Sequence, residues 1–337
     1  MKKYVLQVSI GQKNTAGQKA KEDIAKILNQ QGFENVEIKL KKSRLMKFLF
    51  SRIEVKNKFK NIKADDIFVM QYPMYSRVTT RVIINECSRR KIKKICIIHD
   101  LESLRLYKNN PQKIKEELSG LEKFDCLIAH NEIMANWLRE NGITKPIISL
   151  ELFDYLNDND ISEVSKKDNL IFAGNLEKSK FLEKWNFNKK LTLFGISPSK
   201  NYSEKIDYRG VKSPEELPKF LKGSFGLVWD GNSVNTNNGI YGEYTRFNNP
   251  HKVSLYLSCG LPIVMWKEAA LAKFISKNKL GLVVSNLHEL DDKINNLNDN
   301  EYEEFVLNAR KMATKVRDGF FTKKAVNNAI NVITNYK

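Results

Sequence analysis

The stretch RFNNPHKVSLYLSCGLPI, residues 246–263, has the pattern of a short helix that turns back into a β-strand. Asn248 or Asn249 can cap the helix, and Pro250 suits its first position, where the N–H that proline lacks would have no partner in any case. Gly260 ends the helix, since glycine readily adopts the left-handed conformation that follows a helix C-terminus. The stretch therefore predicts one helix-to-strand step of an α/β fold.

Asn249, His251 and Lys252 occupy the cap and the first turn of this helix. The free backbone N–H groups at a helix N-terminus attract anions, and the lysine adds a full positive charge. The stretch is therefore a candidate site for a pyrophosphate group. The alternative is that the Asn-Pro pair only begins a surface helix and that Lys252 is solvated; the spacing alone leaves both open.

The chain has 337 residues, which suits two domains of about 150 residues better than a single core. It contains no run of about 20 apolar residues that would span a membrane. Two lysines and a short apolar run begin the chain, but polar residues follow at once, so we predict a first strand there and not a signal peptide. We expect a cytoplasmic protein.

The formal net charge is +18, which favours anionic partners such as nucleotide phosphates, nucleic acid or an acidic membrane surface. Residues 39–63 hold ten Lys or Arg against one acid, Glu54, interleaved with apolar side chains. An amphipathic helix near residues 45–53 could contact anionic lipid at the inner face of the membrane. A solvated basic face over a packed apolar stripe is the alternative. We find no basic motif of a known nucleic-acid module and expect no nucleic-acid partner.

Apolar runs alternate with amphipathic segments through residues 1–155, which predicts parallel strands connected by helices. Ligands bind such sheets beyond the carboxyl ends of the strands. We therefore expect the loops that follow the predicted strands to face one cleft. These loops are residues 14–17, with Thr15 and Gly17, residues 72–75, and the pair His99-Asp100.

Residues 154–168 are polar and acidic, and they fit a linker to a second alternating series. The first strand of this series ends in Gly174-Asn175, where the glycine permits a close approach of the backbone. Two long helices close the chain. We therefore predict two α/β domains, residues 1–155 and residues 166–317.

The four cysteines and the four histidines are dispersed, and no two of them have metal-ligand spacing. We expect reduced cysteines packed in the core and no bound metal. The charge stabilisation that a metal would supply must then come from side chains and helix termini.

Five motifs occur in order along the C-terminal half: FAGNLEKSKFLEKW (172–185), IDYRG (206–210), GSFGLVWD (223–230), NNPHKVSLYLSCGLPIV (248–264) and DGFFTKK (318–324). Looser matches in the N-terminal half are residues 14–17, IFVMQYP (67–73) and His99-Asp100. This ordered set resembles bacterial sugar transferases of the β-1,6-galactofuranosyltransferase type. It is also similar to the related glucosyltransferase that extends N-acetylglucosamine on serine-rich streptococcal adhesins.

The resemblance implies a GT-B fold, in which two Rossmann-like domains face each other across a cleft and the C-terminal one holds a nucleotide sugar without a metal. It implies that the last helix, residues 318–337, packs back on the N-terminal domain. By position it assigns Lys178, Tyr208 and Lys252 to the nucleotide diphosphate. With the residues suggested above, the candidate donor-binding set is Thr15, Gly17, Gly174, Asn175, Lys178, Tyr208, Asn249, His251 and Lys252.

Two residues of this set, Lys178 and Tyr208, have alternative interpretations. Members of the resembled family often carry an arginine where Lys178 stands, and a lysine keeps the charge but loses the bidentate fork. Tyr208 lies at the end of a predicted strand, where a tyrosine is often packed in the core with its hydroxyl satisfied.

Many retaining transferases of this fold carry two glutamates eight residues apart, whereas here Glu268 is followed at that spacing by Ser276. The missing glutamate favours inversion at the anomeric carbon, which requires a base that takes the acceptor proton. Asp100 or His99 is the candidate base, and Glu102 is a weaker one. The alternative is that His99-Asp100 only caps a loop.

We therefore predict a UDP-sugar-dependent hexosyltransferase that moves galactofuranose to a saccharide acceptor on a lipid carrier or a glycoprotein. A first alternative is a glucosyltransferase that extends N-acetylglucosamine on a serine-rich adhesin. A second alternative is a non-catalytic partner subunit of another transferase. The resemblance also implies a homo-oligomer. The choice between the two sugars depends on a few hydroxyl contacts.

Overall fold

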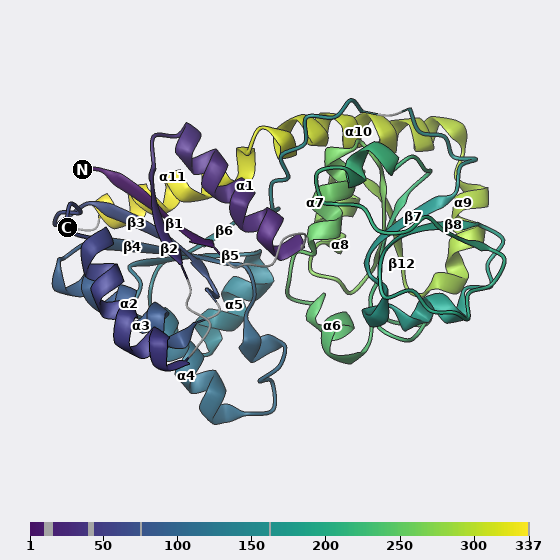
Figure 1. The fold of residues 1–337 in the computed structure, drawn as a ribbon. Coiled ribbons are helices and arrows are strands. Elements are labelled where there is room, and N and C mark those ends of the chain that lie inside the picture. The colour runs from purple at the N-terminus through teal and green to yellow at the C-terminus, as the bar shows by residue number, and fades with distance from the viewer. Residues whose placement is uncertain (10–15, 40–43, 75, 162, 336–337) are drawn as a thin grey trace. The chain divides into compact units, whose positions relative to one another are not determined.

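The structure of the chain is a computed structural model that describes residues 1–9, 16–39, 44–74, 76–161 and 163–335. The chain forms two compact units, each built on its own parallel sheet with helices packed against it (Figure 1). Unit 1 comprises Met1–Leu152 and Gly319–Lys337, and unit 2 comprises Phe153–Asp318. The predicted α/β class with two Rossmann-like sheets is confirmed.

The sheet of unit 1 has six strands in the order β2-β1-β3-β4-β5-β6, all parallel. Interior strands β3, β4 and β5 are buried almost throughout, which explains their continuous apolar runs. The edge strand β2 instead alternates between exposed and buried residues over most of its length. The strands are β1 (Lys3–Ser9), β2 (Glu34–Lys39), β3 (Ile67–Tyr72), β4 (Lys93–Ile98), β5 (Cys126–Ala129) and β6 (Ile147–Ser149).

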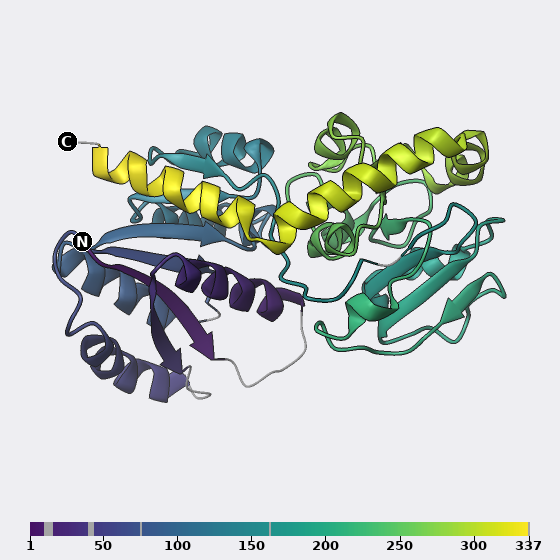
Figure 2. The same cartoon turned by 90° about the horizontal axis from the view of Figure 1, so that it is seen from above.

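Helices α1 and α11 lie together on one face of this sheet, and α2 and α3 pack together on the other (Figure 1). The last helix, α11, contacts β4, β5 and β6 and runs beside α1 (Figure 2). Gly319 permits this approach, because a Cβ there would lie 2.7 Å from Ile27. The helices are α1 (Ala16–Gln30), α2 (Arg44–Lys58), α3 (Arg77–Arg89), the 3₁₀ turn η1 (Glu102–Leu104), α4 (Pro111–Leu121), α5 (Glu132–Glu140) and α11 (Phe320–Asn335).

The sheet of unit 2 has six parallel strands in the order β12-β11-β10-β7-β8-β9. The chain adds β8 and β9 on one side of β7 and then returns to add β10, β11 and β12 on the other. The strand order therefore reverses between β7 and β10, the kind of position at which open α/β sheets bind ligands. The strands are β7 (Leu170–Asn175), β8 (Leu191–Ile196), β9 (Ile206–Tyr208), β10 (Gly226–Val228), β11 (Ile263–Trp266) and β12 (Gly281–Val284).

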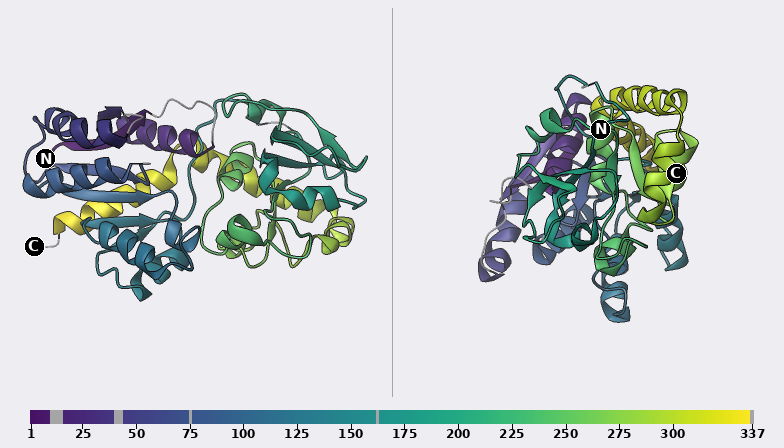
Figure 3. Two further views of the ribbon diagram at one scale, coloured as in Figure 1. Left: turned by 60° about the horizontal axis from the view of Figure 1, so that its bottom comes forward. Right: turned by 90° about the vertical axis from the view of Figure 1, so that its right-hand side faces the viewer.

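Helix α7 packs on β10 and β11 and also contacts α10 (Figure 3). No helix in the described ranges has both the length and the apolar character needed to cross a membrane. The helices of unit 2 are η2 (Leu176–Lys178), η3 (Lys180–Lys184), η4 (Leu217–Phe220), α6 (Gly239–Tyr244), α7 (His251–Ser258), α8 (Ala272–Lys277), η5 (Leu287–Glu289), α9 (Leu290–Asn296) and α10 (Asp299–Arg317).

Helix α7 begins one residue later than the sequence predicts. Pro250 is the cap residue with extended backbone, and no side chain caps the helix there, so the predicted cap at Asn248 or Asn249 is wrong. Pro250 has φ −63° and ψ 131°, which shows that the chain becomes helical only at His251. The predicted end is confirmed, because Gly260 follows the last turn with φ +72°.

Tyr256 fixes α7 to the sheet at the point where the strand order reverses. Strands β7 and β10 pair at Ile171 and Gly226. Two residues further along β7, the N–H of Ala173 donates to the Tyr256 hydroxyl at 2.8 Å. The ring of Tyr256 lies on Gly226, where a Cβ would be 2.2 Å from its Cδ2 atom. The helix thus supplies a hydrogen-bond acceptor to β7 from a fully buried side chain.

We expect Gly226→Ala to lower the free energy of unfolding by about 1–3 kcal/mol, the usual cost of overpacking a core. The added methyl group must displace the Tyr256 ring, which is fully buried and has little room to move. Urea unfolding followed by tryptophan fluorescence is a suitable measurement, because Trp185, Trp229 and Trp266 all lie in the core of unit 2.

Gly120→Ala in α4 is the control. A Cβ there meets no described atom within 4 Å, and replacing glycine by alanine in a helix should stabilise it by up to about 1 kcal/mol. An unfolding free energy for Gly226→Ala equal to that of the wild type would contradict the packing role assigned to this glycine.

Candidate functional site

Lys252 lies at the carboxyl ends of β7 and β10. Its ammonium donates to the carbonyl of Trp229 at 3.1 Å and to the carboxylate of Asp230 at 2.9 Å. It also lies 4.4 Å from the centre of the Phe172 ring. The side chains of Lys252 and Asp230 are only 17% and 15% exposed. A mostly buried cation is therefore fixed where the strand order reverses.

Two glycines bring backbone close to this lysine. Gly174 at the end of β7 lies beside it, since a Cβ on Gly174 would be 3.5 Å from the Cε atom of Lys252. Gly195 of β8 pairs with Gly174, and a Cβ on Gly195 would lie 1.8 Å from the carbonyl oxygen of Gly174. Only glycine fits at position 195 without separating the two strand ends. A group with a small cross-section can thus approach backbone and ammonium together.

Tyr208 lies at the end of β9, and its hydroxyl donates to the carbonyl of Gly195 at 2.9 Å. The residue is 38% exposed, so it is not a core tyrosine. The structure therefore brings three predicted positions together: Gly174 lies beside Lys252, and Tyr208 binds Gly195, the strand partner of Gly174.

Asn175 and Lys178 lie just beyond the end of β7. The side chain of Asn175 accepts from the N–H of Glu177 at 3.1 Å and so caps η2. Lys178 is exposed, and its ammonium lies 3.8 Å from the centre of the Tyr241 ring in α6. Its carbonyl accepts from the N–H of Gly231 at 3.1 Å. Lys178 therefore joins η2 to the loop that follows β10.

Asn249 and His251 flank Pro250 at the start of α7. Asn249 is 2% exposed, so it is part of the packed base of the helix. The ring of His251 packs on Phe153, with 4.6 Å between the ring centres.

The remaining predicted residues belong to unit 1. Thr15 lies outside the described residues, and Gly17 is an exposed residue in the first turn of α1. His99 and Asp100 directly follow β4, as the sequence predicts for residues at a carboxyl end. Of the predicted residues that the structure describes, Gly174, Asn175 and Tyr208 end strands of unit 2, and His99 and Asp100 directly follow a strand of unit 1.

The environment of His99 fixes its protonated nitrogen. The side-chain amide of Gln71 donates to the carbonyl of Lys21 at 3.0 Å. Its oxygen, 2.8 Å from His99 Nε2, must then be the acceptor, so Nε2 carries a proton. The Nδ1 atom of His99 is shielded from solvent. Neither ring nitrogen is therefore presented to solvent as an open proton acceptor.

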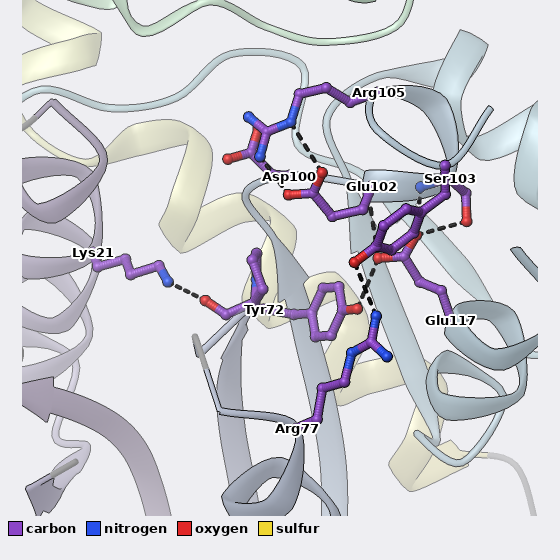
Figure 4. Close-up of polar contacts among 10 residues, drawn as sticks. Lys21, Tyr72, Arg77, Asp100, Glu102, Ser103, Arg105 and Glu117 are labelled. Atoms are coloured by element: carbon purple, nitrogen blue, oxygen red, sulfur yellow. Dashed lines mark hydrogen bonds and ion pairs between the residues drawn. The ribbon is translucent and has the colours of Figure 1, made fainter. Parts of the chain in front are cut away.

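Asp100 has a more accessible carboxylate. Its side chain is 29% exposed and forms an ion pair with Arg105 at 3.1 Å, and Arg105 also binds Glu102 (Figure 4). The ammonium of Lys21 donates to the carbonyl of Pro73 (Figure 4). Burial lowers the pKa of Lys21 to about 8, and the charge of Asp100 opposes this shift. Asp100 therefore pairs directly with Arg105 and interacts electrostatically with Lys21.

Sequence reasoning missed Asp230, Tyr256 and Gly195. Gly195 lies near the carboxyl end of β8 and Asp230 closely follows β10, so the rule that selects Gly174 at the end of its strand would also have selected them. Tyr256 carries no such signal, because an apolar face at helical spacing contains it. Within the described ranges, no group of three or more His, Cys, Asp or Glu side chains is arranged to hold a metal ion.

Comparison with known families gives two adjoining matches. The model described as "Glucosyltransferase 3-like, N-terminal domain" matches residues 2–152, and the model described as "Glucosyltransferase 3-like, C-terminal domain" matches residues 170–329. Together they cover both units, with a boundary in the segment that joins them.

Individual relatives agree with these matches. The chain is 30% identical to the β-1,6-galactofuranosyltransferase WbbI of Escherichia coli K12 over 84% of each chain. It is 27% identical to glucosyltransferase 3 of Streptococcus gordonii over 92% of this chain and 93% of the other. Among solved structures, sucrose-phosphate synthase of Thermosynechococcus elongatus superposes with a TM-score of 0.64 at 11% identity, covering 99% and 100% of the two chains. That structure supports the GT-B fold.

We expect Asp230→Asn to lower the free energy of unfolding by about 2–3 kcal/mol, because it leaves a mostly buried ammonium beside a neutral amide. An anion bound at Lys252 would restore the missing charge. Inorganic pyrophosphate should therefore raise the melting temperature of this variant by more than it raises that of the wild type, as measured by thermal unfolding.

Glu304→Gln provides the control, because Glu304 forms an exposed ion pair with Lys279 elsewhere in unit 2. Its stability should stay within about 0.5 kcal/mol of the wild type, with an unchanged response to pyrophosphate. Equal pyrophosphate shifts in wild type and Asp230→Asn would argue against an anion site at Lys252.

Proposed function

Because this chain belongs to the glucosyltransferase 3-like family of glycosyltransferases, we propose that it moves a hexose from a UDP-sugar to a saccharide acceptor in cell-surface glycan synthesis. Galactofuranose is the proposed sugar. The acceptor would be a saccharide carried by a lipid or a glycoprotein. The observation that carries the donor part of the proposal is the position of Lys252 where the strand order of unit 2 reverses.

The electrostatics of Lys252 suit a diphosphate leaving group. Asp230 and the Trp229 carbonyl accept from the ammonium and hold it in one place. An ammonium has three protons, so one can point at a phosphate oxygen while the other two stay bound. A fixed charge in a mostly buried site stabilises the departing diphosphate without reorganisation of the side chain. We propose that the reaction needs no metal for this reason.

The proposed donor site extends from Lys252 to the residues around it. Gly174 presents backbone without a side chain beside the Lys252 ammonium, Gly195 keeps the two strand ends together, and Tyr208 binds the carbonyl of Gly195. Lys178 supplies a second, exposed positive charge. We propose these contacts with the donor from the positions of the residues around Lys252.

Galactofuranose is preferred because the NNPHK motif resembles the galactofuranosyltransferase type, and the relative with that name is 30% identical. The alternative donor is UDP-glucose, since relatives named glucosyltransferase 3 are 27% and 25% identical. A non-catalytic partner subunit is the other alternative. The ion-paired Lys252 beside Gly174 disfavours it, because a lysine held at the strand ends suits the binding of a donor diphosphate.

We propose Asp100 as the base of an inverting transfer. Its carboxylate is 29% exposed, whereas the Nδ1 atom of His99 is shielded and its Nε2 atom donates to Gln71. Asp100 pairs with Arg105 at 3.1 Å, and a carboxylate is a group that can accept the proton of the acceptor hydroxyl. His99 would then support the strand end on which Asp100 stands.

The test is UDP release from a panel of UDP-galactofuranose, UDP-glucose, UDP-galactopyranose and UDP-N-acetylglucosamine, with wild type and Lys252→Ala. We expect turnover of one donor, with UDP-galactofuranose first, and a loss of about 100-fold in the variant. Proton NMR of the released sugar, recorded before mutarotation, should show inversion at the anomeric carbon.

Lys323→Ala is the matched control, because Lys323 is a lysine of α11 in unit 1. It should keep wild-type turnover. If neither UDP nor any UDP-sugar binds in calorimetry, the proposed UDP-sugar-dependent transfer is wrong. UDP binding without turnover of any donor, together with tight association with another transferase, would favour the partner-subunit alternative. Retention of the anomeric configuration would remove the base assigned to Asp100.

We also propose a peripheral contact with anionic membrane through residues 39–63, and a homo-oligomer. Residues 40–43 lie outside the described residues, as do the side chains of residues 44–50. In the described part, Val55 and Phe59 are packed in the core. The exposed residues there are mostly basic and include Lys39, Arg52, Lys56, Lys58, Lys60 and Lys63, with Asn57, Asn61 and the apolar Ile53. The contact would therefore be mainly electrostatic.

Sedimentation with vesicles tests the membrane contact. We expect binding to vesicles of phosphatidylcholine with 30% phosphatidylglycerol, weaker binding at high salt, and loss of binding when Lys56, Lys58 and Lys60 are changed to Glu, since each basic residue near the surface contributes about 1 kcal/mol. Equal binding to vesicles without the anionic lipid would contradict it. Light scattering in solution gives the oligomeric state, and a monomeric mass would exclude the homo-oligomer.

A further inference from the structure

Glu117 is a buried carboxylate of α4 that collects hydrogen bonds from two separate segments. One oxygen accepts from the Tyr72 hydroxyl at 2.7 Å and from the N–H of Glu102 at 3.2 Å. The other accepts from both the N–H and the hydroxyl of Ser103, each at 2.6 Å. The residue is 8% exposed, and Figure 4 shows the carboxylate between Tyr72 and Ser103.

These contacts tie the end of one strand to the turn that follows another. Tyr72 is the last residue of β3, whereas Glu102 and Ser103 form the 3₁₀ turn η1 beyond β4. The donors are a phenol, a hydroxyl and two backbone N–H groups. Burying a carboxylate is costly unless it is fully hydrogen-bonded, so such a group holds its donors in place. The pKa of Tyr72 is raised by burial and by the charge of Glu117, which keeps the phenol a donor.

The η1 turn, which Glu117 holds in place, is connected to Asp100 through Arg105. Glu102 binds Arg105 through both carboxylate oxygens, one of them 3.2 Å from Nε. Arg105 in turn pairs with Asp100 at 3.1 Å, and the Arg105 side chain is only 20% exposed. Contacts therefore run from Glu117 through the η1 turn and Arg105 to the carboxylate of Asp100 (Figure 4).

We propose that Glu117 is a positioning residue for the transfer reaction, which sets the place of the Asp100 carboxylate through the η1 turn and touches neither substrate. This inference rests on the proposed function, because it takes Asp100 to be the base. A displacement of about 1 Å in a reacting group can reduce the rate by about 100-fold. The cost of burying the Glu117 carboxylate is therefore offset by the gain in rate from a correctly placed Asp100 carboxylate.

A purely structural role for Glu117 predicts different behaviour. Removing a structural carboxylate lowers stability and reduces the active fraction, whichever residue stands at position 100. Removing a positioning carboxylate matters for turnover only while Asp100 is present to be positioned. Effects of residues that act as one unit are strongly non-additive, so a double-mutant cycle separates the two roles.

The experiment measures UDP release from UDP-galactofuranose, with water as acceptor, by wild type, Glu117→Gln, Asp100→Asn and the double variant. The amide that replaces Glu117 keeps the shape but presents an N–H to groups that donate. We expect Glu117→Gln to lower kcat about 10- to 100-fold, with the dissociation constant of UDP from calorimetry unchanged. In the Asp100→Asn background the same change should cost less than about 2-fold.

Glu116→Gln is the matched control, one residue away on α4. Its carboxylate is 54% exposed and pairs with Arg77 at 3.6 Å. It should leave kcat unchanged. If Glu117→Gln folds poorly, Tyr72→Phe removes one of the donors and leaves the rest, and the same cycle should show a smaller, still non-additive loss.

The positioning role would be overturned if the kcat losses of the two single variants multiply in the double variant, or if Glu117→Gln keeps the wild-type kcat. Either result would leave the proposed function intact. Wild-type turnover by Asp100→Asn would overturn it together with the base assignment. Failure of the wild type to bind UDP or turn over any donor is a separate outcome, because it removes the proposed function itself and with it the reaction that Glu117 is inferred to serve.

Discussion

The hydrogen bond from the Ala173 N–H to the Tyr256 hydroxyl is the contact on which the arrangement of unit 2 depends. A backbone N–H inside a sheet must find an acceptor, and Ile171 finds one in the carbonyl of Phe225, just before β10, whereas Ala173 donates to a side chain. The helix supplies this side chain. Lys252 stands four residues before Tyr256 and so on the same face of α7, which brings its ammonium to the opening between the strand ends.

The two units stabilise a buried charge in different ways. In unit 2 the charge of Lys252 is balanced by Asp230, and the pair remains partly accessible at the strand ends. In unit 1 the charge of Glu117 is distributed over neutral donors and is almost fully enclosed. An accessible pair can respond to an arriving anion, whereas an enclosed carboxylate can only hold its neighbours in place. The Lys252–Asp230 pair therefore suits the binding of an anion, and the Glu117 carboxylate suits the positioning of its neighbours.

Much of the fold could be predicted because its signals are local. Interior strands such as β3 and β4 are apolar throughout since both faces are covered, and helices such as α1 repeat their apolar residues at helical spacing. The start of α7 was predicted one residue early. Pro250 fits either a first helical residue or the residue before it, and only the ψ angle of 131° distinguishes them. That angle is set by packing and not by the residue type.

The sequence by itself determined the alternation of strands and helices, the strand-end positions of Gly174 and His99, the place of Lys252 in the first turn of a helix, and the family to which the chain belongs, because spacing and residue type act within short segments. Only the tertiary structure decided that Asp230 pairs with Lys252 and that Glu117 binds the η1 turn. These contacts join residues 22 and 14 positions apart. Such pairs form only when the chain folds back on itself, and no periodic pattern along the chain encodes which side chains will meet.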